Sequence, residues 1–185
     1  MTKKKFLDPN LKNKSKTVED KIQFFDYEDT KLPLPTEIEI SESGTCNRTC
    51  SFCPRSAADF EDKKEFITNE LHEKLCKELQ KLNYKGTIRY SGFVEPLLDK
   101  NIYNLIAMVK NFLPDSNVEM VTNGDPLNLK RLNKLFESGL NRILISAYDG
   151  KEDADKLEDL CLGKNVNLDI ICNGILNKTR FLIDN

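Results

Sequence analysis

The sequence has no tryptophan, one histidine and no apolar run near the roughly 18 to 20 residues that cross a membrane. It also lacks an excess of one charge, because 28 lysines and arginines stand against 30 aspartates and glutamates. Nucleic-acid-binding domains usually carry a clear basic excess, so nucleic acid is not an expected partner. The first residues include lysines but no apolar segment typical of a secretion signal. We therefore expect a cytoplasmic protein with no membrane partner.

Composition and length predict a small globular protein. Hydrophobic residues make up 39% of the sequence and charged residues 31%, near the range of ordinary globular chains. At roughly 100 to 200 residues per domain, the length predicts one domain with a short extension. We place an N-terminal extension at residues 1–35, with a lysine-rich arm and a short helical pattern at about Val18–Phe25. The core domain is expected at residues 36–185.

From residue 36 onward, short strand patterns alternate with amphipathic helix patterns. This alternation with short connections is typical of parallel strands joined by right-handed crossovers. The sequence therefore predicts an α/β fold whose parallel strands follow one another in chain order. The pattern alone leaves open whether the sheet is open or closes toward a barrel. The expected strands are 36–41, 87–91, 117–122, 142–147 and 166–171, and the expected helices are 68–83, 101–113, 126–138 and 151–162.

Polar residues gather where the predicted strands end. Parallel α/β folds bind their ligands beyond the carboxyl ends of the strands, so these residues predict one ligand-binding rim. In strand order they are Cys46, Cys50 and Cys53, then Gly92 and Glu95, then Asn123 and Gly124, then Ser146, and finally Asn173 and Gly174.

Three of the six cysteines lie in one loop, CNRTCSFC at residues 46–53, with the spacing C-x3-C-x2-C. In a chain without a secretion signal, clustered cysteines more often bind metal than form disulfides. Thiolates suit zinc or an iron-sulfur cluster, and a 4Fe-4S cluster held by only three cysteines leaves one iron open to an outside ligand. The alternative is a structural zinc site completed by His72 or Cys76, which lie four residues apart on one helix.

The cysteine loop resembles the signature of the radical S-adenosylmethionine superfamily. Its position after the first strand, the segment Gly92–Pro96 after the second and Thr122-Asn123-Gly124 after the third strengthen the likeness. The resemblance covers roughly residues 36–174. It implies a partial (β/α)6 TIM-like barrel with parallel strands, whose sixth strand is expected only at about 179–184.

The resemblance also implies cofactors and their ligands. Cys46, Cys50 and Cys53 would bind a 4Fe-4S cluster, whose open iron is chelated by the amino and carboxylate groups of S-adenosyl-L-methionine (SAM). The cofactor contacts implied are Gly92 and Glu95 for the methionine ammonium, with Asn123 and Ser146 along the cofactor or at its ribose.

Simpler interpretations compete at several positions. Glu95 is alternatively a surface carboxylate, and Asn123-Gly124 a generic turn. We interpret the sole histidine, His72, as a solvated helix residue. The cysteines outside the loop are expected to be small buried apolar residues rather than a second cluster, namely Cys76, Cys161 and Cys172. Two arginines flanking the cysteine loop are interpreted as charge balance, Arg48 and Arg55, and two tyrosines either face a substrate or pack, Tyr90 and Tyr148.

Together these features predict an enzyme. The resemblance implies reductive cleavage of SAM to a 5'-deoxyadenosyl radical that takes hydrogen from an unidentified substrate, with an electron donor such as a flavodoxin or ferredoxin. The motifs CPR at residues 53–55 and GxxEPLL at residues 92–98 resemble those of peptide-modifying members and favour peptide or protein modification. Two alternatives stay open. The chain is a non-catalytic module with a structural zinc or iron-sulfur site, or it is a cluster enzyme that works only beside a second subunit, since no C-terminal cap is expected.

Overall fold

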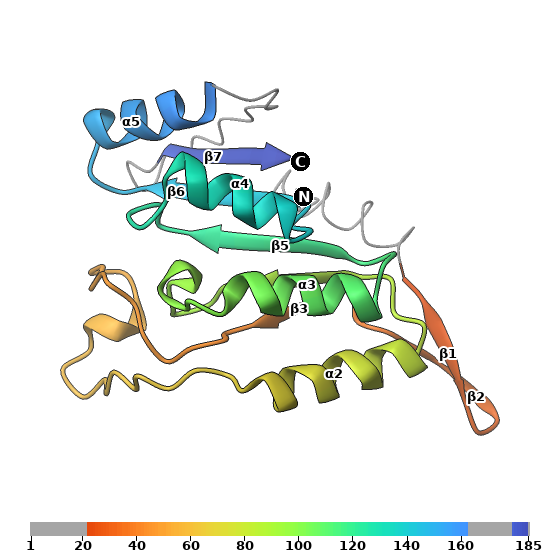
Figure 1. Cartoon of the computed structure of the whole chain (residues 1–185). Coiled ribbons are helices and arrows are strands. Elements are labelled where there is room, and N and C mark those ends of the chain that lie inside the picture. The colour runs from red at the N-terminus through yellow and green to blue at the C-terminus, as the bar shows by residue number, and fades with distance from the viewer. Residues whose placement is uncertain (1–21, 163–178, 185) are drawn as a thin grey trace, which may run out of the picture.

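The computed structural model describes residues 22–162 and 179–184, which form a five-stranded sheet, a separate two-stranded hairpin and the helices around them (Figure 1). Within these ranges, every helix is too short or too polar to cross a bilayer. The elements are β1 (Phe24–Tyr27), β2 (Thr30–Pro33), β3 (Glu37–Ile40), η1 (Pro54–Ser56), α2 (Asn69–Lys81), β4 (Thr87–Tyr90), η2 (Pro96–Leu98), α3 (Ile102–Phe112), β5 (Asn117–Thr122), α4 (Leu129–Glu137), β6 (Arg142–Ala147), α5 (Lys151–Leu162) and β7 (Thr179–Asp184).

The five-stranded sheet has the order β3-β4-β5-β6-β7, and β3 to β6 are parallel neighbours. A helix follows each of β4, β5 and β6, and α2 connects β3 to β4. The predicted mixed α/β class and the chain-order pairing of these four strands are confirmed. The predicted strand at 166–171 lies outside the described residues.

The last strand departs from the expected parallel arrangement. A strand does form at 179–184, but β7 runs antiparallel to β6, with Thr179 opposite Ala147 and Asp184 opposite Arg142. Because Thr179 lies beside the carboxyl end of β6, the chain enters β7 at that end and runs back along its neighbour. The expectation of parallel strands throughout was therefore wrong for β7.

Two further boundaries differ from the sequence prediction. Phe24 and Phe25, expected at the end of a short helix, lie in β1 and pair with β2. Helix α4 begins at Leu129, not at Pro126, because Asn128 is its cap and accepts a hydrogen bond from the Arg131 N–H at 2.9 Å. The residues before it form a turn, in which the Leu127 N–H donates to the Gly124 carbonyl at 2.9 Å.

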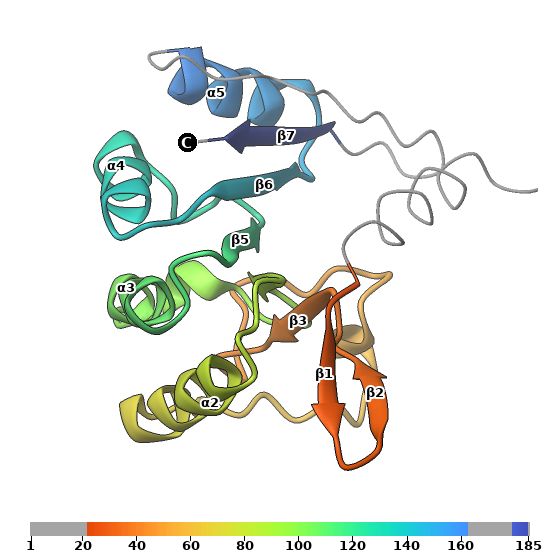
Figure 2. The same cartoon turned by 90° about the vertical axis from the view of Figure 1, so that its right-hand side faces the viewer.

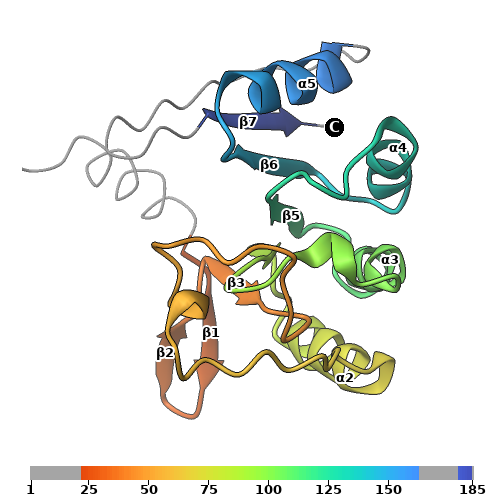
Figure 3. The same cartoon turned by 90° about the vertical axis from the view of Figure 1, so that its left-hand side faces the viewer.

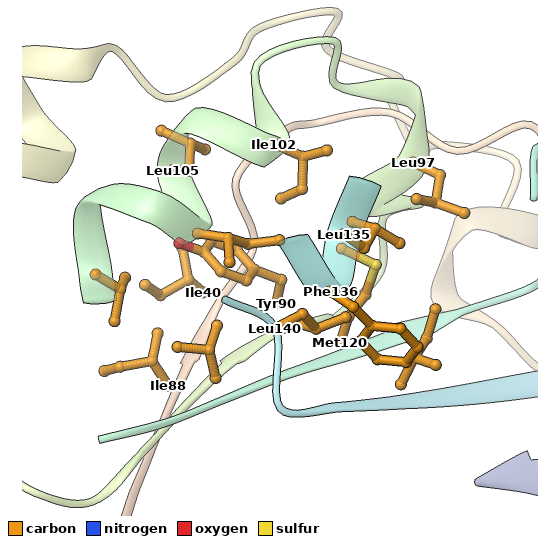
Figure 4. Packing of buried hydrophobic residues seen from close by; sticks show 14 of the residues in the cluster. Ile40, Ile88, Tyr90, Leu97, Ile102, Leu105, Met120, Leu135, Phe136 and Leu140 are labelled. Carbon is orange, nitrogen blue, oxygen red and sulfur yellow. The ribbon is translucent and has the colours of Figure 1, made fainter. Parts of the chain in front are cut away.

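Helices α2, α3 and α4 lie side by side on one face of the sheet (Figure 2). Alternate strand residues point toward them and are buried, as period-two strands require. Figure 4 shows this core from close by. Its fully buried members include Ile88, Tyr90, Leu97, Ile102, Leu105, Met120, Leu135 and Leu140. Figure 3 looks onto the carboxyl ends of the parallel strands, where the long loop from β3 to α2 lies.

Candidate functional site

A cavity of about 560 Å³ lies at the carboxyl ends of the parallel strands. It is bordered by the loop after β3, the segment after β4, and the ends of β5 and β6. The structure therefore brings together side chains that are up to about a hundred positions apart in sequence. All seven predicted site residues border it: Cys46, Cys50, Cys53, Gly92, Glu95, Asn123 and Ser146.

The three loop cysteines are free and partly exposed to this cavity. The loop is folded on itself by backbone hydrogen bonds, with the Cys53 N–H donating to the Cys50 carbonyl at 2.9 Å. The Arg48 N–H lies 3.4 Å from the Cys46 sulfur. Burial raises the pKa of Cys46, and this N–H partly offsets the effect. A metal takes cysteine as the thiolate, so metal binding at this site would release the thiol proton.

The thiols are not gathered on a single point. Among residues 22–162 and 179–184, no three Cys, His, Asp or Glu side chains are arranged so that they could hold one metal ion. A zinc ion takes all its ligands on one atom, whereas a 4Fe-4S cluster takes each thiolate on a different iron. Three free thiols around one cavity therefore fit the cluster in donor type and number, and they do not form a ready zinc site.

Glu95 is almost fully buried, with 1% of its surface exposed, although it borders the cavity. Its Oε1 accepts hydrogen bonds from the Thr122 hydroxyl at 2.6 Å and the Leu97 N–H at 3.0 Å. Its Oε2 accepts one, from the Asn123 N–H at 2.8 Å. Burial raises the pKa of Glu95, against the effect of these bonds. The surface interpretation was wrong, and Oε2 keeps a lone pair for a ligand.

Gly92 allows a close approach at the end of β4. Its φ is +116°, and a Cβ there would lie 2.2 Å from the Ser41 hydroxyl oxygen. That hydroxyl donates to the Ser91 carbonyl at 3.0 Å, so it cannot move away freely. Any side chain at this position would therefore clash as well as strain the backbone.

Asn123 joins the end of β5 to the cysteine loop. Its amide nitrogen donates to the Asn47 side-chain oxygen at 2.8 Å, and its own side-chain oxygen accepts from the Asp125 N–H at 2.9 Å. The residue thus makes the turn expected from its sequence and also borders the cavity. Ser146, at the end of β6, is buried and lies on the same cavity wall.

Sequence reasoning missed a charged cluster that holds the cysteine loop to the rim. Arg48 pairs with Asp125, with its Nε 2.6 Å from Oδ2, and with Asp149, with its Nη2 2.6 Å from Oδ2. Its guanidinium also lies 5.4 Å from the ring centroid of Tyr148, which stacks on Phe52 at 5.8 Å. These pairs raise the pKa of Arg48 and lower that of Asp149. The partners are far apart in sequence, so no local pattern could reveal them.

Arg55 also borders the cavity, but it faces carbonyls and a carboxylate. It donates to the Gly44 carbonyl at 3.2 Å and the Phe93 carbonyl at 3.1 Å, and it pairs with Asp62. Both flanking arginines thus have protein partners. Their hydrogen bonds and ion pairs order the loop, and the expected charge balance toward a bound group stays a prediction.

His72 and Cys76 lie away from the cavity, between α2, β4 and α3. His72 is buried, and its Nε2 lies 2.8 Å from the Tyr90 hydroxyl, so the expectation of a solvated residue was wrong. Burial lowers the pKa of His72 to about 4 and raises that of Cys76 to about 11. Neither can complete a metal site with the loop. Cys76 is the buried apolar residue that was predicted, whereas Cys172 and the side chain of Cys161 lie outside the described part of the chain.

The sequence of this chain matches a known family and known proteins. Residues 40–177 match the family model of the radical SAM superfamily. The chain is 33% identical over 113 residues to the S-adenosyl-L-methionine-dependent 2-deoxy-scyllo-inosamine dehydrogenase of Niallia circulans, covering 61% of this chain and 45% of that protein. It is 30% identical over 145 residues to a GTP 3',8-cyclase of Campylobacter lari, covering 75% of this chain and 41% of that protein.

A solved structure agrees. The crystal structure of BtrN in complex with AdoMet and 2-DOIA superposes with a TM-score of 0.57 at 33% identity, over 60% of this chain and 44% of that one. The matched parts are less than half the length of each of these relatives. Their names refer to an aminocyclitol and to GTP, so they give no support to the expected peptide substrate.

Proposed function

The chain belongs to the radical SAM superfamily, whose members use a 4Fe-4S cluster and SAM, and from that premise we propose that it cleaves SAM reductively. Cys46, Cys50 and Cys53 are the proposed cluster ligands. The observation that carries the proposal is the common cavity, which all seven predicted site residues border at the carboxyl ends of the parallel strands.

When bound, the cluster supplies one electron for cleavage of SAM into methionine and a 5'-deoxyadenosyl radical that takes hydrogen from the substrate. The chain's own residues hold and orient the cofactor. Glu95 receives the methionine ammonium on Oε2, the oxygen that accepts one hydrogen bond. Gly92 lets the backbone approach the cofactor closely, and Asn123 and Ser146 line its ribose side.

The surrounding fold is proposed to be a partial (β/α)6 barrel. Four parallel strands in chain order, with α2, α3 and α4 on one face, support this. The opposite face would then be the inner wall of the barrel. SAM and the substrate would exclude water from that wall.

We propose a small polar molecule as the substrate, in place of the peptide expected from sequence. The names of two relatives, a dehydrogenase of 2-deoxy-scyllo-inosamine and a cyclase of GTP, support this class. The proposed partner is a one-electron donor such as a flavodoxin or ferredoxin. A second subunit is a further proposed partner, and nothing in the comparisons supports or opposes it.

Anaerobic reconstitution of the full chain tests the proposal. We expect about four irons and as many labile sulfides per chain. Addition of SAM and a reductant should then release 5'-deoxyadenosine. Tightly held zinc without iron would instead support the structural metal module. About eight irons would show a second cluster and contradict the single-cluster account.

A further inference from the structure

A row of charged side chains crosses the face of the sheet that α2, α3 and α4 leave open. The strand register places one member on each strand. Glu39 of β3 lies opposite Arg89 of β4, Arg89 opposite Glu119 of β5, Glu119 opposite Arg142 of β6, and Arg142 opposite Asp184 of β7. Signs alternate along the row, so neighbouring strands attract one another across it.

The two arginines of this row are satisfied by carboxylates. Arg89 pairs with Glu37 at 2.5 Å and with Glu119 at 2.7 Å. Arg142 pairs with Asp184 at 2.5 Å and with Glu119 at 3.6 Å. With Glu37 and Glu39 included, four carboxylates face two guanidiniums, which leaves this wall with an excess of two negative charges.

Glu39 is the carboxylate of this row that has no cation. Among the residues that the structure describes, it forms no ion pair and no hydrogen bond, and it borders the cavity together with Arg89. Its Oε1 lies 3.6 Å from the point where a Cβ on Gly92 would be, so it is next to the proposed cofactor segment. Val121 and Leu144 add apolar surface to the wall of the same cavity.

A ligand that fills the cavity removes water from this carboxylate. An ionised carboxylate that loses its water without gaining a partner is costly, so the preferred ligand is one that brings a positive charge. The ammonium of SAM already has a proposed partner in Glu95. Arg89 keeps further N–H donors beside its two ion pairs, because a guanidinium carries five. This part of the wall therefore presents the Glu39 carboxylate to a cationic group and Arg89 N–H donors to an oxygen atom.

We propose that Glu39 determines substrate specificity by pairing with an ammonium group of the substrate, which is thus a small amine that also carries hydroxyl or carbonyl oxygen. The proposal rests on the proposed function, since it takes SAM to occupy the rest of the cavity. Glu39 holds the substrate amine, and Arg89 donates to an oxygen of the same molecule.

The test uses the anaerobically reconstituted full chain, saturated with SAM, and calorimetric titration with pairs of compounds. Each pair is a free amine and its N-acetyl derivative, which keeps the skeleton and removes the charge. The three amines are 2-deoxy-scyllo-inosamine, glucosamine and ethanolamine. The variant is Glu39→Gln. The matched control is Glu137→Gln, which removes the same charge from an exposed position of α4 that does not border the cavity.

We expect at least one free amine to bind about tenfold more tightly than its N-acetyl partner in the parent and in Glu137→Gln. In Glu39→Gln this preference should fall below about twofold, while iron content and SAM affinity stay unchanged. The proposal is overturned if no amine is preferred by the parent, or if the preference survives in Glu39→Gln. Weaker SAM binding by Glu39→Gln would overturn it too, because it would assign Glu39 to the cofactor. Failure of the parent to bind SAM at all would instead contradict the proposed function.

Discussion

The two faces of the five-stranded sheet differ in what their side chains contact. Toward α2, α3 and α4, the strands present buried apolar residues such as Ile88, Val118 and Ile143. Toward the other side, the neighbouring residues on the same strands are charged or half-exposed, as Arg89 and Glu119 are. Since adjacent strand residues point to opposite faces, one short sequence carries both patterns.

This difference separates stability from chemistry. Parallel sheets are usually covered on both faces, so a charged face that no helix of residues 22–162 covers, next to three loop thiols, is unusual for a purely structural surface. The helix-covered face should govern the free energy of unfolding. The open face and its rim should govern ligand binding. This division would be wrong if variants on the helix-covered face changed only ligand binding, or if variants at the rim changed only the free energy of unfolding.

The largest contrast is expected between two cysteines. Cys50→Ala should lose the cluster, because two thiolates remain on the loop and a cubane needs three from it. Cys76→Ala should keep full iron content and lose only stability, because Cys76 is buried on α2 and does not border the site cavity. Iron and sulfide analysis after reconstitution measures both. Full iron content in Cys50→Ala would show that the cysteine loop does not bind the cluster.

Neighbouring residues of β6 give the next contrast. Ile143→Ala should lower the free energy of unfolding by about 2 to 5 kcal/mol, because the side chain is fully buried in the core. Leu144→Ala should cost about 1 kcal/mol, since Leu144 is partly exposed on the cavity wall. Denaturant titration compares them. Equal losses would show that the open face is packed as tightly as the core.

Glu42 offers a pH test on the buried side. It is fully buried, and burial raises its pKa from 4.5 to about 7. The unfolded chain releases this proton near pH 4.5 and the folded protein near pH 7. The proton therefore stabilises the fold below pH 4.5, and that contribution, up to about 3 kcal/mol, is lost as pH rises through 7.

Glu42→Gln isolates this effect from that of other groups. His72 acts in the opposite sense, because its pKa is lowered to about 4 and its contribution is lost as pH falls. The difference in unfolding free energy between parent and variant should therefore grow in favour of the variant from pH 5 to pH 8. A difference that does not change with pH would show that Glu42 is charged in the fold.

The last prediction concerns Glu95 at the rim. Glu95→Gln should weaken SAM binding by about 1.5 to 3 kcal/mol, the range for hydrogen bonds to charged groups. Iron content should not change, because Glu95 is not a proposed cluster ligand. Calorimetry with SAM on the reconstituted variant measures the loss. If affinity equals that of the parent, Glu95 only joins Thr122, Leu97 and Asn123 and does not touch the cofactor.

The sequence predicted what depends on local pattern. The strand and helix alternation follows from periodicity, and the cysteine spacing places three thiols on one loop. The burial of His72 could not be read in this way, because Leu71 is the apolar member of these two neighbours, yet Leu71 is exposed and His72 faces the core. One residue of helix rotation, set by packing against α3 and β4, decides between them.

Long-range geometry was likewise hidden. The Arg48 cluster joins three loops that are distant in sequence, and the reversal of β7 depends on where the chain re-enters the sheet. The role of Glu39 depends on which of several carboxylates the arginines take. None of these choices is encoded in a short stretch of residues.

The central claim is that this cavity supports reductive cleavage of SAM. The most direct measurement is the amount of 5'-deoxyadenosine that the reconstituted chain forms with SAM and a reductant, with Cys50→Ala measured beside it. The account predicts that the parent forms 5'-deoxyadenosine and methionine in equal amounts and that Cys50→Ala forms neither. A parent that carries about four irons, binds SAM and still forms no 5'-deoxyadenosine would contradict it.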